Sequence, residues 1–290
     1  MTTALRALLE HIVDYAGLFP PAALDLDAAV QQYAANRDSP DAWMLGRFVV
    51  GAARVSELSE RVAAMRPSTP WPIGAVATNV EQAQTILARP DDAAILIRSL
   101  EVKTDSATLS AVAGSEIKGR EIFIETPVDA LLEERLDAIA GHGFRAKIRT
   151  GGVTPDAFPP SVDVVRFLRG CLERDLPFKA TAGLHHPIRG AYRLTYADDA
   201  PTGLMFGFLN VFVAAVLMRD GLSDRDAVEL LDDPDPASIV VTDDAIAWRG
   251  HRAALASITA ARVRFATSFG SCSFREPVDE LPFTLSRVGA

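Results

Sequence analysis

Cysteine is almost missing from this sequence: the 290 residues include only Cys171 and Cys272. Two thiols that lie far apart in a long chain do not make the disulfide framework of a small secreted domain. Cys171 lies in a helical pattern and is explained by packing, whereas Cys272 lies between two serines in a glycine-containing turn. Because no general base can be identified beside Cys272 in the sequence, we do not assign it as a nucleophile. We expect both thiols to be reduced.

Long apolar runs and an excess of basic residues are also lacking. The longest apolar stretch, residues 205–218, is interrupted by Gly207 and Asn210 and is shorter than the roughly 20 residues that cross a bilayer. The N-terminus has no signal-peptide layout. A net charge of −9 and an isoelectric point near 5.1 argue against nucleic acid, which requires a basic surface. We therefore expect a cytoplasmic protein with no membrane and no nucleic-acid partner.

Two further absences bear on the fold. No Gly-x-Gly-x-x-Gly follows the first predicted strand, which argues against a dinucleotide-binding fold. There is no low-complexity linker and no internal repeat of about 20–50 residues. The hydrophobic fraction of 49% is enough for a substantial core. We therefore predict a single domain over residues 1–290.

Short apolar runs alternate with amphipathic segments up to residue 187. The apolar runs predict seven strands, at residues 11–18, 43–52, 73–77, 94–98, 121–125, 145–149 and 178–182. The segments between them predict helices at residues 26–36, 56–65, 80–87, 108–113, 130–140 and 161–175. Repeated strand–helix units with short loops favour a parallel sheet, and this number of units predicts an α/β fold, a closed (β/α)8 TIM-type barrel.

The last part of the chain, residues 191–290, predicts a decorated final βα portion followed by a C-terminal tail. Extra helices are expected at residues 205–220, 223–231 and 252–264. Residues 238–241 and 245–248 predict a small β-hairpin. Residues 265–274 form either strand eight or a loop that closes the site.

Charged residues occur inside two of the predicted strands. Arg145, Lys147 and Arg149 alternate with apolar residues in one strand, and Lys179 and Thr181 do so in the other. Side chains of a strand point alternately to opposite faces, so each strand has one apolar and one polar face. A cationic face on a central strand is costly unless it is solvated, paired or used. This pattern predicts a polar cavity with an anionic ligand.

The same alternation places charges of other strands on the inner face of the barrel, near the strand ends that carry active sites in this fold. The predicted floor of the site consists of Arg98, Glu125, Lys147, Arg149, Lys179 and Thr181. Its predicted rim consists of Asp14, Tyr15, His185 and His186. Arg145 lies low on its strand, and we interpret it as part of a structural ion pair.

A lysine amine is a nucleophile only when it is deprotonated, and burial and nearby cations both lower its pKa. Glu125 by itself cannot neutralise Lys147, Lys179 and two arginines, so a lowered pKa is expected at Lys147. Such an amine forms a Schiff base with a carbonyl compound, and Glu125 is the expected general acid or base.

The segments Lys147-Ile-Arg-Thr-Gly-Gly152 and Phe178-Lys-Ala-Thr-Ala-Gly183 resemble class I aldolases of the deoxyribose-phosphate aldolase type. The resemblance covers about 40 residues. It implies that Lys147 is the Schiff-base residue and that Lys179 lowers its pKa. Ile148 and Arg149 replace the small polar residues usual in that family, and its proton-relay aspartate has no clear counterpart here.

Other residues are candidates for substrate contacts. Residues 267–275 combine small residues with Arg275, so that backbone amides and Ser271 could hold a phosphate or carboxylate. His185 and His186 are expected to contact the substrate. Alternatively, one of them binds a metal ion together with a carboxylate. No His-x-His or His-Glu-x-x-His spacing is present, so we assign no metal ligand.

These observations favour a lyase that acts on a small phosphorylated or carboxylated carbonyl compound through a lysine Schiff base, without a cofactor. Two alternatives stay open. One is a metal-dependent lyase or isomerase that uses His185 or His186, and the other is a non-catalytic barrel that binds an anionic metabolite. The sequence also leaves a homo-oligomer open.

Overall fold

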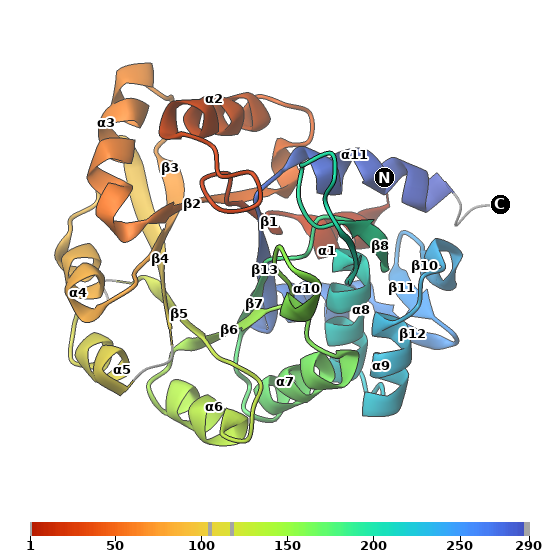
Figure 1. Ribbon diagram of the computed structural model, residues 1–290. Coiled ribbons are helices and arrows are strands. Elements are labelled where there is room, and N and C mark those ends of the chain that lie inside the picture. Colours follow the sequence, from red (N-terminus) through yellow and green to blue (C-terminus); the bar gives the residue numbers. More distant parts are fainter. Residues whose placement is uncertain (1, 104–105, 117–118, 287–290) are drawn as a thin grey trace.

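The computed structural model of the chain describes residues 2–103, 106–116 and 119–286. Eight parallel strands close into a barrel (Figure 1). These strands are β1 (Val13–Tyr15), β2 (Leu45–Gly51), β3 (Trp71–Val76), β4 (Ile95–Lys103), β5 (Glu121–Glu125), β6 (Arg145–Arg149), β7 (Phe178–Thr181) and β13 (Ala266–Ser271). The first seven follow one another around the barrel, and β13 closes it between β7 and β1. The predicted TIM-type barrel is confirmed, and residues 265–274 contain strand eight.

Helices surround the barrel, as Figure 1 shows. Those between successive strands are α2 (Leu26–Arg37), α3 (Val55–Met65), α4 (Val80–Ala88), α5 (Ser106–Ala113), α6 (Leu132–Gly141), α7 (Ser161–Glu173) and α8 (Phe208–Arg219). Short 3-10 turns are η1 (Ala42–Met44), η2 (Ala52–Arg54), η3 (Pro155–Ala157) and η4 (Pro236–Ser238). The α4 helix begins where the Asn79 side chain accepts a hydrogen bond from the Gln82 amide. Ser56, whose position suggests a cap for α3, lies inside that helix, and its hydroxyl accepts from Arg89.

The elements outside the barrel are more numerous than the sequence predicts. They are α1 (Thr3–Leu9), the hairpin of β8 (Gly190–Arg193) and β9 (Thr202–Met205), α9 (Asp224–Leu231), α10 (Leu255–Arg264) and α11 (Arg275–Ser286). The expected hairpin is the first part of a three-stranded sheet of β10 (Ile239–Val241), β11 (Ala245–Trp248) and β12 (His251–Ala254). The predicted helix at 252–264 is therefore shorter, because its first residues pair with β11. In Figure 1 this sheet and α9 lie outside α8.

Most of the apolar stretch at residues 205–218 forms the buried helix α8, which begins at Phe208 and not at residue 205 as predicted, because Met205 ends β9. Asn210 within this helix is fully buried and donates to the carbonyls of Leu230 and Asp233, while its carbonyl oxygen accepts from the Arg189 amide. All of its polar groups thus have partners, which makes burial of an amide tolerable. Across the described residues, no helix has the length and apolar character needed to cross a membrane.

An irregularity in β4 changes which of its residues face the barrel interior. The pairing of β3 with β4 jumps from Ile73 with Ile97 to Gly74 with Ser99, so Arg98 is the extra residue of a β-bulge. Arg98 is exposed, whereas Ser99 and Glu101 are buried. The bulge shifts the alternation by one residue, and Glu101 takes the interior place expected for Arg98.

Candidate active site

A cavity of about 400 Å³ lies at the carboxyl ends of the barrel strands. It is lined by the last residues of β4, β5, β6 and β7 and by the segment that follows β13. Its charged and nucleophilic lining residues are Glu101, Lys103, Glu125, Lys147, Arg149, Lys179, His185 and Cys272. This is the end of the barrel at which active sites of the fold are found.

Two lysines on neighbouring strands form the floor of this cavity. Lys147 and Lys179 are direct partners in the pairing of β6 with β7, and their exposed fractions are only 5% and 1%. Glu125 pairs with Lys147 across β5 and β6, so the three side chains lie at one level of the barrel. The predicted grouping of Glu125, Lys147 and Lys179 is therefore present.

The carboxylates and cations of the floor alternate in a continuous chain. Lys179 Nζ lies 2.7 Å from both Asp14 Oδ2 and Glu101 Oε1. Lys147 Nζ lies 2.8 Å from both Glu101 Oε2 and Glu125 Oε2. Arg149 Nε ends the chain at 3.3 Å from Glu125 Oε1. Three carboxylates thus meet three cations, and we call these six residues the charge chain.

The charge chain corrects the expected electrostatics of the lysines. Glu125 is not the one carboxylate available to them, as the sequence had suggested, because Glu101 and Asp14 also bind their ammonium groups. Asp14 was expected at the rim, but it is buried and is not among the residues that line this cavity; Ser268 Oγ also donates to it at 2.8 Å. Tyr15, also expected at the rim, is buried and its ring packs against Phe48.

Each shared carboxylate is held in its ionised form. Burial alone would raise the pKa of Glu101, but the ammonium groups of Lys147 and Lys179 lower it to about 2. Burial likewise opposes ionisation of Glu125 and Asp14, and the neighbouring cations keep the pKa of each below its usual value.

Lys147 is shifted in the direction opposite to the one predicted. Burial alone would lower the pKa of Lys147, but Glu101 and Glu125 outweigh it and raise that pKa. The side chain is therefore an ammonium in the ligand-free protein, with both carboxylates as acceptors of its hydrogen bonds.

The other predicted contact residues divide into two groups. Arg149, Thr181 and His185 line the cavity. Arg98, Ser271 and Arg275 are not among its lining residues. Ser271 is buried at the end of β13, where its hydroxyl accepts from the Ser273 amide, and Arg275 is exposed and binds Asp41 and Asp279.

The two adjacent histidines point to different partners. His185 Nδ1 lies 2.7 Å from Glu276 Oε2, and His186 Nδ1 lies 2.9 Å from Glu280 Oε2. His186 stacks on Tyr192 and lines a separate, smaller cavity. In the part of the chain that the structure describes, no group of three or more His, Cys, Asp or Glu side chains is arranged to hold a metal ion. The metal-dependent alternative therefore gains no geometric support.

Backbone segments from three loops complete the wall of the cavity. The loop after β1 contributes Ala16, Phe19, Pro20 and Pro21, as a rigid proline-containing wall would. In the loops after β6 and β7 the Gly151 and Gly183 backbones approach closely, because a Cβ at Gly183 would lie 2.8 Å from Gly151 Cα. Gly183 also has a φ of +74°, which favours glycine.

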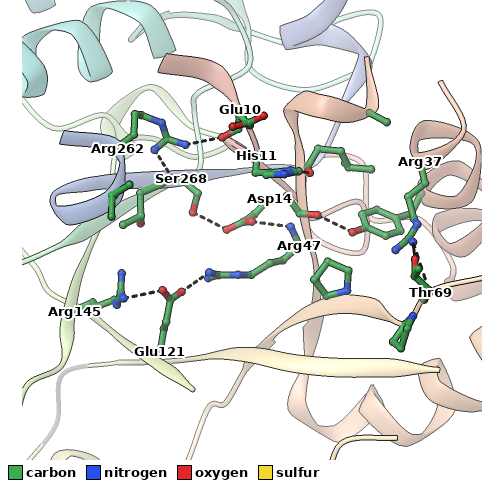
Figure 2. Close-up of a pocket in the computed structure, with 18 residues that line it drawn as sticks. Glu10, His11, Asp14, Arg37, Arg47, Thr69, Glu121, Arg145, Arg262 and Ser268 are labelled. Carbon is green, nitrogen blue, oxygen red and sulfur yellow. Dashed lines mark hydrogen bonds and ion pairs between the residues drawn. The ribbon is translucent and has the colours of Figure 1, made fainter. Parts of the chain in front are cut away.

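A second cavity, of about 640 Å³, lies at the opposite end of the barrel and is shown in Figure 2. There Glu121 bridges Arg47 and Arg145, so the ion pair expected for Arg145 is present. The guanidinium groups of both arginines and the ammonium of Lys179 lie over the ring of Phe123. The arginine pair and Lys179 therefore share contacts with one buried aromatic ring.

No family model, no curated protein and no solved structure matches the chain. The resemblance to class I aldolases thus stays a prediction from two short motifs, and the function has to be argued from the site itself.

Proposed function

We propose that the chain is an enzyme of the lyase type, which makes or breaks a carbon–carbon bond beside the carbonyl group of a small anionic compound. The observation that carries this proposal is the position of Lys147 Nζ at the floor of the C-terminal cavity, between Glu101 and Glu125. A primary amine between two proton acceptors has the groups that Schiff-base formation requires.

Arg149 supports an anionic substrate. Its side chain is 53% exposed and lines the cavity, and its one carboxylate partner is shared with Lys147. A guanidinium in this position presents further N–H donors to a carboxylate or phosphate of the substrate. The carbonyl group of a small compound held there would lie toward the lysines.

The proposed chemistry begins with the transfer of a proton from Lys147 to Glu125. The neutral amine attacks the carbonyl carbon, and the resulting alkoxide oxygen takes the proton from Glu125. The nitrogen of the carbinolamine then gives a second proton to Glu125, which passes it to the hydroxyl group as that group leaves as water. The resulting iminium ion accepts the electron pair released when the adjacent carbon–carbon bond breaks, while the hydroxyl group on the departing carbon gives its proton to Glu125 and becomes a carbonyl. Glu101 keeps its contact with Lys179 and balances the positive charge of that ammonium group.

The raised pKa of Lys147 favours a second candidate, a barrel that binds an anionic metabolite without covalent chemistry. In that case the lysines remain ammonium groups and act only as anion ligands. The two candidates differ in whether a bond to Lys147 forms.

Reductive trapping distinguishes them. The protein is incubated with pyruvate or glyceraldehyde 3-phosphate and cyanoborohydride, and adducts are located by peptide mass analysis. The sequence has only four lysines, Lys103, Lys118, Lys147 and Lys179, so the assignment is unambiguous. We expect an adduct on Lys147 that is lost in Lys147→Arg and kept in Lys103→Arg, which removes another lysine that lines the cavity. Calorimetric binding without any adduct would favour the second candidate, and an adduct on other lysines alone would contradict the first.

A further inference from the structure

A cysteine, a histidine and a glutamate from three distant segments meet at the wall of the C-terminal cavity. Cys272 directly follows β13, His185 lies in the loop after β7, and Glu276 lies in the first turn of α11. His185 Nε2 lies 4.0 Å from Cys272 Sγ, and His185 Nδ1 lies 2.7 Å from Glu276 Oε2. The imidazole therefore bridges a thiol and a carboxylate.

The orientation of the imidazole suits proton transfer from the thiol. A hydrogen bond from Nδ1 to Glu276 leaves Nε2 directed to the sulfur, which is the arrangement of a nucleophile, its base and the group that orients the base. Glu276 is itself held in place, because the Tyr196 hydroxyl donates to the same oxygen at 3.1 Å. A separation of 4.0 Å is within the looser geometry that such pairs show before substrate binds.

The pKa shifts of His185 and Glu276 agree with this arrangement. Burial alone would lower the pKa of His185, but Cys272 and Glu276 raise it to about 9. Burial opposes ionisation of Glu276, and its contact with His185 lowers its pKa. The neutral form of this histidine, which predominates above about pH 9, is a stronger base toward the thiol than an ordinary imidazole and is the form that accepts its proton.

Cys272 and His185 face the same cavity as the charge chain. Both line it, although only 5% of Cys272 is exposed, so a ligand reaches the sulfur through the cavity. The other cysteine of the chain, Cys171, is fully buried in α7 and burial raises its pKa well above its usual value. Cys272 is thus the thiol of this chain that is placed for chemistry.

We propose that Cys272, His185 and Glu276 form a second reactive centre, which transfers the acyl group of a small anionic ester or thioester to water. The Cys272 proton passes to His185 Nε2 as the sulfur attacks the acyl carbon. His185 then gives that proton to the departing alcohol or thiol, which leaves an acyl group on the sulfur. Water attacks this acyl carbon and gives a proton to His185, which returns it to the departing sulfur.

This centre is independent of a Schiff base on Lys147 and shares only the cavity with it. Arg149 lines the same cavity and gives it positive charge, which is why an anionic acyl compound is expected. The role of Glu276 is that of a positioning residue, because its carboxylate contacts the imidazole and not the sulfur.

The test uses 4-nitrophenyl hydrogen succinate, with neutral 4-nitrophenyl acetate for comparison. We expect a burst of nitrophenolate, a succinyl group mapped to Cys272, and a burst rate at least tenfold higher than with the acetate. Cys272→Ser and His185→Gln should reduce the burst rate at least 100-fold, whereas Cys171→Ala should keep it. Glu276→Gln should reduce it about tenfold and shift the pH profile of the burst to lower pH, since the carboxylate that raises the His185 pKa is removed.

Several results would overturn this proposal. They are a burst that persists in Cys272→Ser, an acyl group found only on other residues, or equal rates in wild type and His185→Gln. A measurement on unaltered protein guards against misfolded variants: iodoacetamide should modify Cys272 well before Cys171 and abolish the burst. Modification of Cys272 with an undiminished burst would also disprove it. The acyl group and the reduced Schiff base are mapped to different residues, so either proposal can fail without the other.

Discussion

At the scale of single residues, Glu101 is the central member of the charge chain because it is shared by two ammonium groups. Its oxygens lie 2.8 Å from Lys147 Nζ and 2.7 Å from Lys179 Nζ. An intact buried ion pair contributes little net stability. Removal of one partner costs more than that contribution, because an uncompensated charge is left in the interior. Glu101 is therefore the residue at which the floor of the site is most sensitive to substitution.

Glu101→Gln should lower the free energy of unfolding by about 3 kcal/mol, since it leaves two buried lysines with less compensation. Urea denaturation followed by circular dichroism measures the change. Glu60→Gln on the exposed side of α3 is the matched control, with the same change in net charge and an expected effect below about 0.5 kcal/mol. Equal effects of the two substitutions would argue against a stabilising role of the charge chain.

Arg149 and Arg98 give a second test at the residue scale, because both were predicted to bind the anion and only Arg149 lines the cavity. Arg149→Ala should weaken binding of pyruvate or glyceraldehyde 3-phosphate about tenfold, through loss of a charge-assisted contact. Arg98→Ala, on the exposed bulge of β4, should leave the affinity unchanged. Isothermal titration calorimetry measures both, and a comparable loss in Arg98→Ala would contradict the placement of the site.

At the scale of elements, the loops after β6 and β7 depend on two glycines in contact. Gly183 combines a left-handed φ of +74° with a Cβ position 2.8 Å from Gly151 Cα and 2.9 Å from Phe158 Cε1. Neither neighbour is the far end of a flexible chain, so a methyl group forces the two loops apart. These loops carry part of the cavity wall.

Gly183→Ala should therefore destabilise the protein by at least ~2 kcal/mol and weaken ligand binding. Gly143→Ala is the matched control, because Gly143 has a φ of +68° with no neighbour within 4 Å of its Cβ position. That variant should lose only about 1 kcal/mol, the cost of the left-handed backbone for alanine. Thermal or urea unfolding of both variants separates backbone strain from the contact between loops, and similar losses would argue against the contact.

The bounds of the strands also show what the local sequence pattern predicts and what it misses. Strands 121–125 and 145–149 were predicted with their observed bounds, because short β-rich runs between turns are a strong local signal. The strand predicted at 94–98 was too short, because the bulge at Arg98 breaks the alternation on which the prediction depended. Glu101 was missed for that reason: it lies beyond the predicted end and in the opposite phase.

At the scale of the whole molecule, the charge chain joins five of the eight barrel strands. Its members come from β1, β4, β5, β6 and β7. Protonation of its carboxylates therefore weakens contacts across the barrel rather than within one element. This links the stability of the entire fold to pH.

The stability of the protein should fall in acid in a range set by Glu101. Its pKa is about 2 in the folded protein and 4.5 as the ordinary value, so the folded state favours the ionised form. The corresponding stabilisation, about 3 kcal/mol, is present above pH 4.5 and is lost as the pH falls through 2. Urea unfolding from pH 6 to about pH 2 measures it. Glu101→Gln should show a flatter dependence than wild type, and parallel curves would contradict the assignment.

The reactive group at the cavity wall also belongs to the scale of the whole molecule. His185 and Glu276 are 91 residues apart, and Cys272 is 87 residues from His185. No spacing motif connects them, which is why Cys272 had no identifiable base in the sequence. A helix after the last strand, α11, supplies the carboxylate, and that helix was not predicted either.

Local residue patterns were sufficient for the alternation of strands and helices, for the closed barrel and for the inward direction of Lys147, Arg149 and Lys179. Each of these follows from periodicity and from turn or cap residues within a few positions. The residues that pair with those charged side chains could not be predicted from the local sequence. Contacts of Lys179 with Asp14 and Glu101 join positions 165 and 78 residues apart, and they exist because the barrel closes β1 against β13 and β13 against β7. The direction of the Lys147 pKa shift depends on those distances, since Coulomb interactions depend on separation in space and on burial.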